Sequence, residues 1–165
     1  MKKALLNKAR LLLNVTVLFA VTFNAQAVSL NIENYRSGED LGCVDLPEDG
    51  FILSFVHSVS LTPVEDVYLI KKNAGGDLEI RQTQERFVAH GQGLPSLQNE
   101  PDAVGFKTEN GMFILHLDRQ IKDLIVRLDK RYKNRLDTGR EITNLNQWPD
   151  DIGLRMQPVT DCEQG

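Results

Sequence analysis

A strand–turn–strand signal near the middle of the chain limits the fold more than any other stretch. In Phe51–Val59 the odd positions are nearly all apolar and alternate with the even positions, which predicts a strand with its odd face toward the core. Ser60–Pro63 follows as a turn, because proline fixes its own φ and restricts the residue before it. The β-forming residues of Glu65–Lys72 then predict the return strand of an antiparallel hairpin.

The rest of the chain repeats this pattern of short alternating segments between turn signals. Asn73–Asp77 and Asn110–Gly111 are typical turn sequences. The polar stretches Asn34–Asp49 and Ser96–Gly105, which contain glycine and proline, are predicted to be loops. No convincing long helix is indicated, so the sequence predicts an all-β fold, a single-domain antiparallel β-sandwich or barrel. The further predicted strands are Val28–Glu33, Leu78–Ala89, Met112–Asp118, Ile121–Leu128 and Ile152–Pro158.

The first 27 residues have the order of a secretory signal peptide. A basic start precedes an apolar run, Leu11–Phe23, and Ala25-Gln26-Ala27 is a small-x-small cleavage site. The run is too short to span a bilayer comfortably. We therefore expect cleavage after Ala27, no stable membrane anchor afterwards, and a periplasmic location for the β-rich domain 28–165. The alternative is a short uncleaved anchor.

Removal of this segment makes the remaining chain strongly acidic. Residues 1–27 hold four basic and no acidic side chains, so the other 138 residues carry 15 basic and 23 acidic ones, a net charge of −8. An acidic domain does not suit a phosphate backbone, so we expect no nucleic-acid partner. The length suits one domain with a modest core.

Two cysteines lie near the two ends of this domain, Cys43 and Cys162. An exported chain meets oxidising conditions, so we expect a disulfide between them. A loop of about 100 residues closed in this way would gain on the order of 4–5 kcal/mol in the chain-entropy model. Free thiols or an intermolecular bridge are the alternatives, and a pair this far apart without spaced histidines is not a zinc pattern.

The hairpin also carries the candidate site. His57 lies on the predicted core face, and Ser58 points the opposite way, so the two cannot form a nucleophile–base pair within one strand. No Gly-x-Ser-x-Gly motif of a hydrolase occurs. A buried imidazole needs a partner, and we expect Glu65 or Asp66 to approach His57 across the hairpin. The sequence does not decide between the two carboxylates.

Two further segments are candidates for binding. Gly91-Gln92-Gly93 precedes Leu94-Pro95 and is either an ordinary turn or a loop that offers backbone N–H groups to a ligand. Lys130–Arg135 is a basic run in an acidic domain. It is either a solvated loop or edge, or a docking patch for an acidic partner or anionic lipid.

These short motifs resemble a known family. Phe55–Val59, Thr62–Tyr68 and the later Gly91–Pro95 are similar to the small exported bacterial domain-of-unknown-function family numbered eighteen-fifty. The matching positions are His57, Ser58, Pro63, Gly91 and Gly93. Genes of that family commonly lie beside permeases of TAXI-type TRAP transporters, which import organic anions. The resemblance implies a periplasmic accessory role, with the permease or its substrate-binding protein as partner.

Two functions remain open at this stage. The first is a non-catalytic periplasmic binding or accessory protein, with no metal and no other cofactor. The second is a metal-dependent or acid–base enzyme that uses His57, His90, His116 and one of the two carboxylates. The histidines show no short His-x-His or His-x-x-x-His spacing, which favours the first function.

Overall fold

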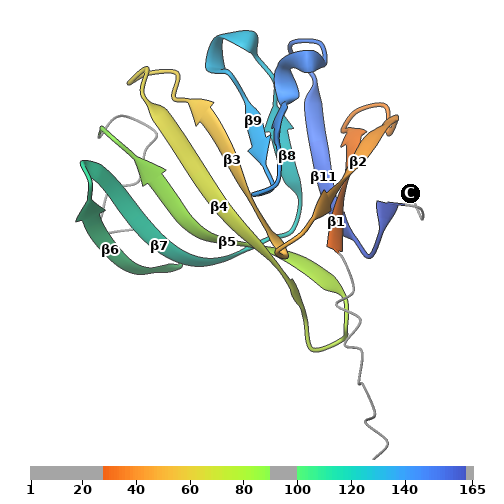
Figure 1. Ribbon diagram of the computed structural model, residues 1–165, viewed down its shortest axis with the longest axis horizontal. Helices are drawn as coiled ribbons and strands as arrows, with labels where there is room; N and C mark the ends of the chain where they lie inside the picture. The colour runs from red at the N-terminus through yellow and green to blue at the C-terminus, as the bar shows by residue number, and fades with distance from the viewer. Residues whose placement is uncertain (1–27, 90–99, 163–165) are drawn as a thin grey trace, which may run out of the picture.

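The chain forms two antiparallel β-sheets that pack face to face. The computed structural model describes residues 28–89 and 100–162. Within these residues the elements are strands and two short 3₁₀ turns, arranged as an open sandwich rather than a closed barrel (Figure 1). This confirms the predicted all-β class and selects the sandwich. The elements are β1 Val28–Asn34, β2 Asp40–Leu46, β3 Gly50–Val56, β4 Pro63–Lys72, β5 Leu78–Phe87, β6 Ala103–Glu109, β7 Met112–Ile121, β8 Leu124–Arg127, η1 Lys130–Tyr132, β9 Arg135–Asp137, β10 Ile142–Asn144, η2 Leu145–Gln147 and β11 Gly153–Val159.

The larger sheet is built around the predicted hairpin. Its order is β10-β9-β3-β4-β5-β7-β6, and the smaller sheet has the order β2-β1-β11-β8 (Figure 1). In the hairpin, Phe51 pairs with Tyr68 and Leu53 pairs with Asp66. Directly opposite residues of an antiparallel pair share a face, so these four side chains point toward the smaller sheet.

The core fills the space between the two sheets. The smaller sheet contributes Leu30 and Ile32 from β1 and Leu154 and Met156 from β11, all at most 1 % exposed. Phe51 contributes from the larger sheet, and its ring stacks on that of Tyr68 with 4.9 Å between centroids. Full burial of each aliphatic or aromatic side chain stabilises the fold by roughly 1.5–3 kcal/mol, so this cluster holds the sheets together.

Two strands lie where the sequence predicted loops. β2 falls inside Asn34–Asp49 and pairs with β1, and β6 begins inside Ser96–Gly105 and pairs with β7. Both are edge strands. All seven residues of β6 are exposed, and β2 buries only Leu46 fully. An edge strand without a buried row shows little apolar alternation, so the pattern that predicts the other strands is missing here.

The first strand of the hairpin is shorter than predicted. β3 ends at Val56, and residues 57–62 form the turn. Val59, predicted to be on the core face, is therefore 61 % exposed. Pro63, predicted to lie in the turn, is the first residue of β4 and pairs with Val56.

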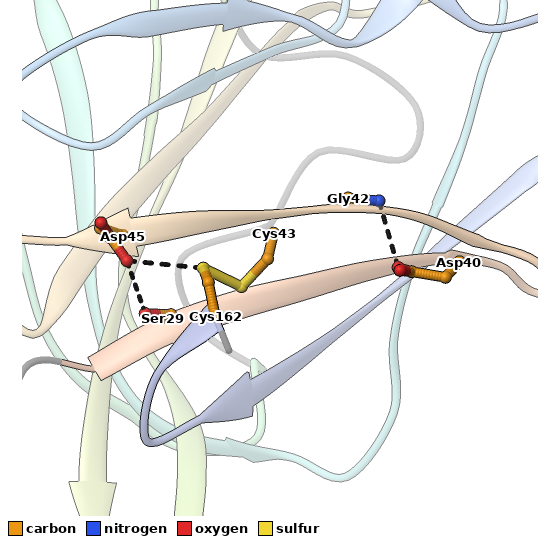
Figure 2. The surroundings of a disulfide bond; sticks show 6 residues. All are labelled: Ser29, Asp40, Gly42, Cys43, Asp45 and Cys162. Atoms are coloured by element: carbon orange, nitrogen blue, oxygen red, sulfur yellow. Dashed lines mark hydrogen bonds between the residues drawn. A yellow bond between two sulfur atoms is a disulfide. The ribbon is translucent and has the colours of Figure 1, made fainter. Parts of the chain in front are cut away.

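The predicted disulfide is present. Cys43 of β2 and Cys162, just after β11, are joined with 5.5 Å between their Cα atoms (Figure 2). Beside the bond, the Ser29 hydroxyl on β1 donates to the Asp45 carboxylate on β2 at 2.9 Å. The bond thus ties the end of the chain to the edge strand of the smaller sheet.

The predicted signal peptide, residues 1–27, lies outside the described residues. Among those that are described, no helix combines the length and the apolar composition needed to cross a bilayer.

Candidate functional site

His57 organises the turn between β3 and β4. Its ring Nδ1 accepts the backbone N–H of Ser60 at 3.1 Å and lies 3.0 Å from the Ser60 hydroxyl, which lies 2.7 Å from that of Thr62. The backbone of His57 bonds to the far side of the turn, to Thr62 and Leu61. The predicted carboxylate partner is therefore wrong: the imidazole is only partly buried, and the turn itself supplies its partner.

These contacts fix the tautomer of the neutral ring. A backbone N–H can only donate, so Nδ1 of His57 is the acceptor and the proton lies on Nε2. The remaining Nε2–H is a donor for other groups.

The strand pairing separates the two candidate carboxylates. Glu65 pairs with Ser54 and lies on the outer face, where its carboxylate is 3.4 Å from the Arg86 guanidinium. Asp66 pairs with Leu53 on the inner face. Asp66 accepts a 2.9 Å hydrogen bond from Gln82 Nε2 and a longer one, 3.4 Å, from the Tyr68 hydroxyl. Only Asp66 can reach the space between the sheets.

Burial makes the Asp66 carboxyl a weaker acid than an exposed aspartate side chain. Loss of water raises the pKa of its carboxyl to about 6, although the hydrogen bonds from Gln82 and Tyr68 lower it in part. Burial also raises the pKa of the Tyr68 hydroxyl.

A second carboxyl lies beside Asp66. Glu85 is its cross-strand neighbour on β5, and burial together with the charge of Asp66 raises the pKa of Glu85 to about 7. The nearby Arg119 guanidinium lowers both pKa values, and it donates to Gln82 Oε1 at 3.2 Å. At neutral pH the two carboxyls are therefore partly protonated.

A pocket of about 530 Å³ opens between the hairpin and the β8–η1 segment. Its apolar wall includes Phe55 and Val56 from β3 and Leu124 and Val126 from β8. This volume lies in the range of small-molecule sites. The polar side chains that line it include His57, Ser58, Asp66, Tyr68, Arg127 and Arg131.

Two ion pairs line the pocket. Arg127 lies 3.4 Å from Asp151, and both side chains line it. Arg131 pairs with Asp129 and holds the pKa of that carboxyl down at about 2. The basic run Lys130–Arg135 forms η1 and the start of β9; of its cations Arg131 lines the pocket, and Lys130, which does not line it, lies 3.7 Å from Asp150.

The family comparison agrees with the resemblance in the motifs. A family model, described as Domain of unknown function (DUF1850), matches residues 51–145. The chain belongs to this family. Searches among curated proteins and among solved structures found no match. The DUF1850 match begins at β3 and ends in η2, so it contains both walls of the pocket.

The DUF1850 hairpin brings some of the predicted site residues together. His57, Ser58 and Asp66 line one pocket, whereas Glu65 lies on the opposite face and Pro63 starts β4. Gly91, Gln92 and Gly93 lie outside the described residues. Tyr68 and Arg127 were not predicted as site residues; the two-residue spacing of Tyr68 from Asp66 could have indicated the first, whereas no local pattern links Arg127 to the hairpin. Arg131 belongs to the predicted basic run Lys130–Arg135, which the sequence did not connect with the hairpin.

The histidines do not converge in the described part of this DUF1850 chain. His116 pairs with Gln84 on β5, next to the inward Glu85, so it lies on the outer face, away from His57. His90 lies outside the described residues. Within residues 28–89 and 100–162, no three His, Cys, Asp or Glu side chains are grouped as metal ligands would be.

Proposed function

We propose that this chain is a non-catalytic binding protein of the periplasm that holds a small organic acid in its pocket, as an accessory of a TAXI-type TRAP transporter. The observation that carries the proposal is the pocket itself, in which an apolar wall meets a few polar side chains. An organic anion with an apolar body matches this combination.

The mouth of the pocket offers donors to a carboxylate. Each guanidinium has five N–H groups, and Arg127 uses one contact, at 3.4 Å, for Asp151. The His57 ring supplies a further donor, because its Nδ1 is occupied by the turn and its Nε2 carries the proton. Planar guanidinium groups suit carboxylates because they can donate two parallel hydrogen bonds.

Asp66 makes this binding sensitive to pH. An ionised Asp66 repels an anionic ligand, whereas its protonated form is uncharged and can donate. Because the pKa of Asp66 is about 6, affinity for an organic acid should rise as the pH falls through this value, as long as the ligand remains ionised.

Calorimetry with hexanoate tests the binding proposal, and the uncharged hexanamide is the matched control. We expect hexanoate to bind more tightly than hexanamide, and more tightly at pH 5.5 than at pH 7.5. Ser58→Trp should block the mouth, whereas Ser37→Trp, in an exposed turn outside the pocket, should bind as the wild type does. Equal binding by the two tryptophan variants would argue against this pocket.

Uptake of a labelled organic acid tests the accessory role. Cells that carry a TAXI-type permease are compared with and without this chain, and then with the Ser58→Trp variant. We expect uptake to need the wild-type chain and to be lost with Ser58→Trp but not with Ser37→Trp. Uptake that is independent of the chain would contradict the transporter role and leave the calorimetric result unaffected.

The Asp66–Glu85 pair favours a second candidate function, an acid–base enzyme. Two neighbouring carboxyls with pKa values of about 6 and about 7 can hold and release a proton near neutral pH. Conversion of a bound organic acid, followed by proton NMR and abolished in Asp66→Asn, would support this function. A metal-content measurement on the purified protein distinguishes a metal-dependent enzyme from a metal-free acid–base enzyme.

A further inference from the structure

The turn between β3 and β4 exposes two large aliphatic side chains. Val59 is 61 % exposed and Leu61 is 72 % exposed. Turn tips usually carry glycine or short polar side chains, and exposed apolar side chains grouped on a surface mark interaction sites. We call Val59 and Leu61 the tip.

The tip is held in one conformation at a local cost. Leu61 has φ of +56°, in the left-handed region that a side chain with a Cβ rarely occupies. The hydrogen bonds of His57 and Ser60 surround it on the turn and hold it there. Backbone strain that the surroundings maintain is a reason to look for a function, and here the strained residue is the most exposed aliphatic one of the turn.

An apolar hollow lies next to the tip. His57 and Ser58, at the base of the turn, line the mouth of the pocket, whose wall is formed by Phe55, Val56 and Val126. One end of the sandwich therefore presents a projecting apolar tip and an apolar recess side by side. Two copies related by a two-fold axis could each place the tip of one chain in the recess of the other.

The charges around the mouth fit a second copy better than a membrane. Two cations and two carboxylates that line the pocket pair with one another: Arg127 with Asp151, and Arg131 with Asp129. A rim with equal numbers of both signs can exchange partners with its own copy. An anionic membrane surface attracts a surplus of positive charge, and these pairs supply none in a domain, residues 28–165, whose net charge is −8.

We propose that the tip is a self-association site, in which Val59 and Leu61 of each chain enter the pocket of a second copy and the rim pairs Arg127–Asp151 form across the interface. The contact is reciprocal, so it closes as a dimer. It uses the same apolar wall as a small ligand would, so a given pocket holds either the ligand or the tip.

Sedimentation velocity over a concentration series tests this proposal, with the full chain exported into the periplasm of an expression host and its disulfide intact. We expect a reversible dimer that Leu61→Asp weakens by about tenfold or more, as for truncation of an interface hot spot. Val104→Asp is the matched control, because Val104 is 69 % exposed but lies on β6, at the far edge of the larger sheet. It should leave the dimer intact.

Three further single variants and one double variant keep the result independent of folding. Leu61→Gly removes the side chain but suits the positive φ, so it should fold normally and still be monomeric. Arg127→Asp and Asp151→Arg should each weaken the dimer, and together they should restore it. A wild type that stays monomeric at several hundred micromolar, or a dimer that Val104→Asp breaks and Leu61→Asp does not, would overturn the proposal.

Discussion

At the scale of single residues, His57 stabilises a turn through one ring nitrogen and leaves the other as a donor. Nδ1 accepts the Ser60 N–H within the turn, so the side chain closes a local loop of four residues. Asparagine could take over the acceptance of the Ser60 N–H, because its short side chain carries an oxygen that accepts backbone N–H groups in turns of this kind.

We therefore expect His57→Ala and His57→Asn to differ. The alanine variant should lose about 0.5–1.5 kcal/mol of unfolding free energy, the value of an ordinary hydrogen bond, and the asparagine variant should lose less. Urea denaturation measures both. If Nε2–H also contacts the ligand, His57→Asn should bind hexanoate more weakly at nearly unchanged stability. Normal binding by this variant would restrict His57 to its structural role.

Asp66 should make the stability of the fold depend on pH. Burial disfavours the ionised carboxylate and raises the pKa from 3.8 to about 6. The unfolded chain releases this proton first, so stability is full below about pH 4 and falls as the pH rises through 6. A shift of about two pKa units corresponds to on the order of 2–3 kcal/mol.

The measurement is urea unfolding between pH 4 and pH 8. Asp66→Asn should remove about half of the total fall in unfolding free energy, because the pKa of Glu85 is raised as well, to about 7, and Glu85 contributes to the same pH window. Glu65→Gln, on the outer face, controls for the loss of a carboxylate as such. A wild-type curve that rises with pH through this window would refute the buried-acid interpretation.

At the scale of elements, the turn 57–62 is a small unit that depends on Leu61. A residue with a Cβ at φ +56° is strained by roughly 1–2 kcal/mol, and glycine relieves that strain while adding roughly 0.5–1 kcal/mol of unfolded-chain entropy. Leu61→Gly should thus leave the unfolding free energy unchanged or raise it by up to about 1.5 kcal/mol. Chemical denaturation checks this, and a clear loss of stability would show that the Leu61 side chain supports the turn.

Strands with a buried face could be predicted from the sequence, whereas exposed edge strands could not. The alternation in Phe51–Val59 predicted β3 because Phe51 and Leu53 are buried, whereas β6 has no buried residue to mark it. The site divides in the same way. The hairpin predicted His57 and one of the two carboxylates Glu65 and Asp66, without deciding between them. The opposite wall comes from Arg127 and its neighbours, about 60 residues later, and that contact depends on packing between sheets rather than on local pattern.

At the scale of the whole molecule, the disulfide closes nearly the entire fold. It joins residues separated by 119 positions, and a loop of that size is worth about 4–5 kcal/mol in the chain-entropy model. Reduction, or replacement of Cys43 and Cys162 by serine, should lower the unfolding free energy by about this amount. The serine variant should not respond to reductant, and an unchanged wild-type midpoint under reduction would contradict the prediction.

The pairing of β1 with β11 has a consequence for how the chain is made. β1 lies between β2 and β11, with Leu30 opposite Pro158. The chain emerges with β1 before β11, whether from the ribosome or from an export channel, so the smaller sheet closes only when its last strand arrives, while the hairpins of the larger sheet can form from neighbouring segments. Until then β1 has β2 on one side only and offers its other edge to chaperones or proteases, and a chain truncated before residue 153 never passes this stage.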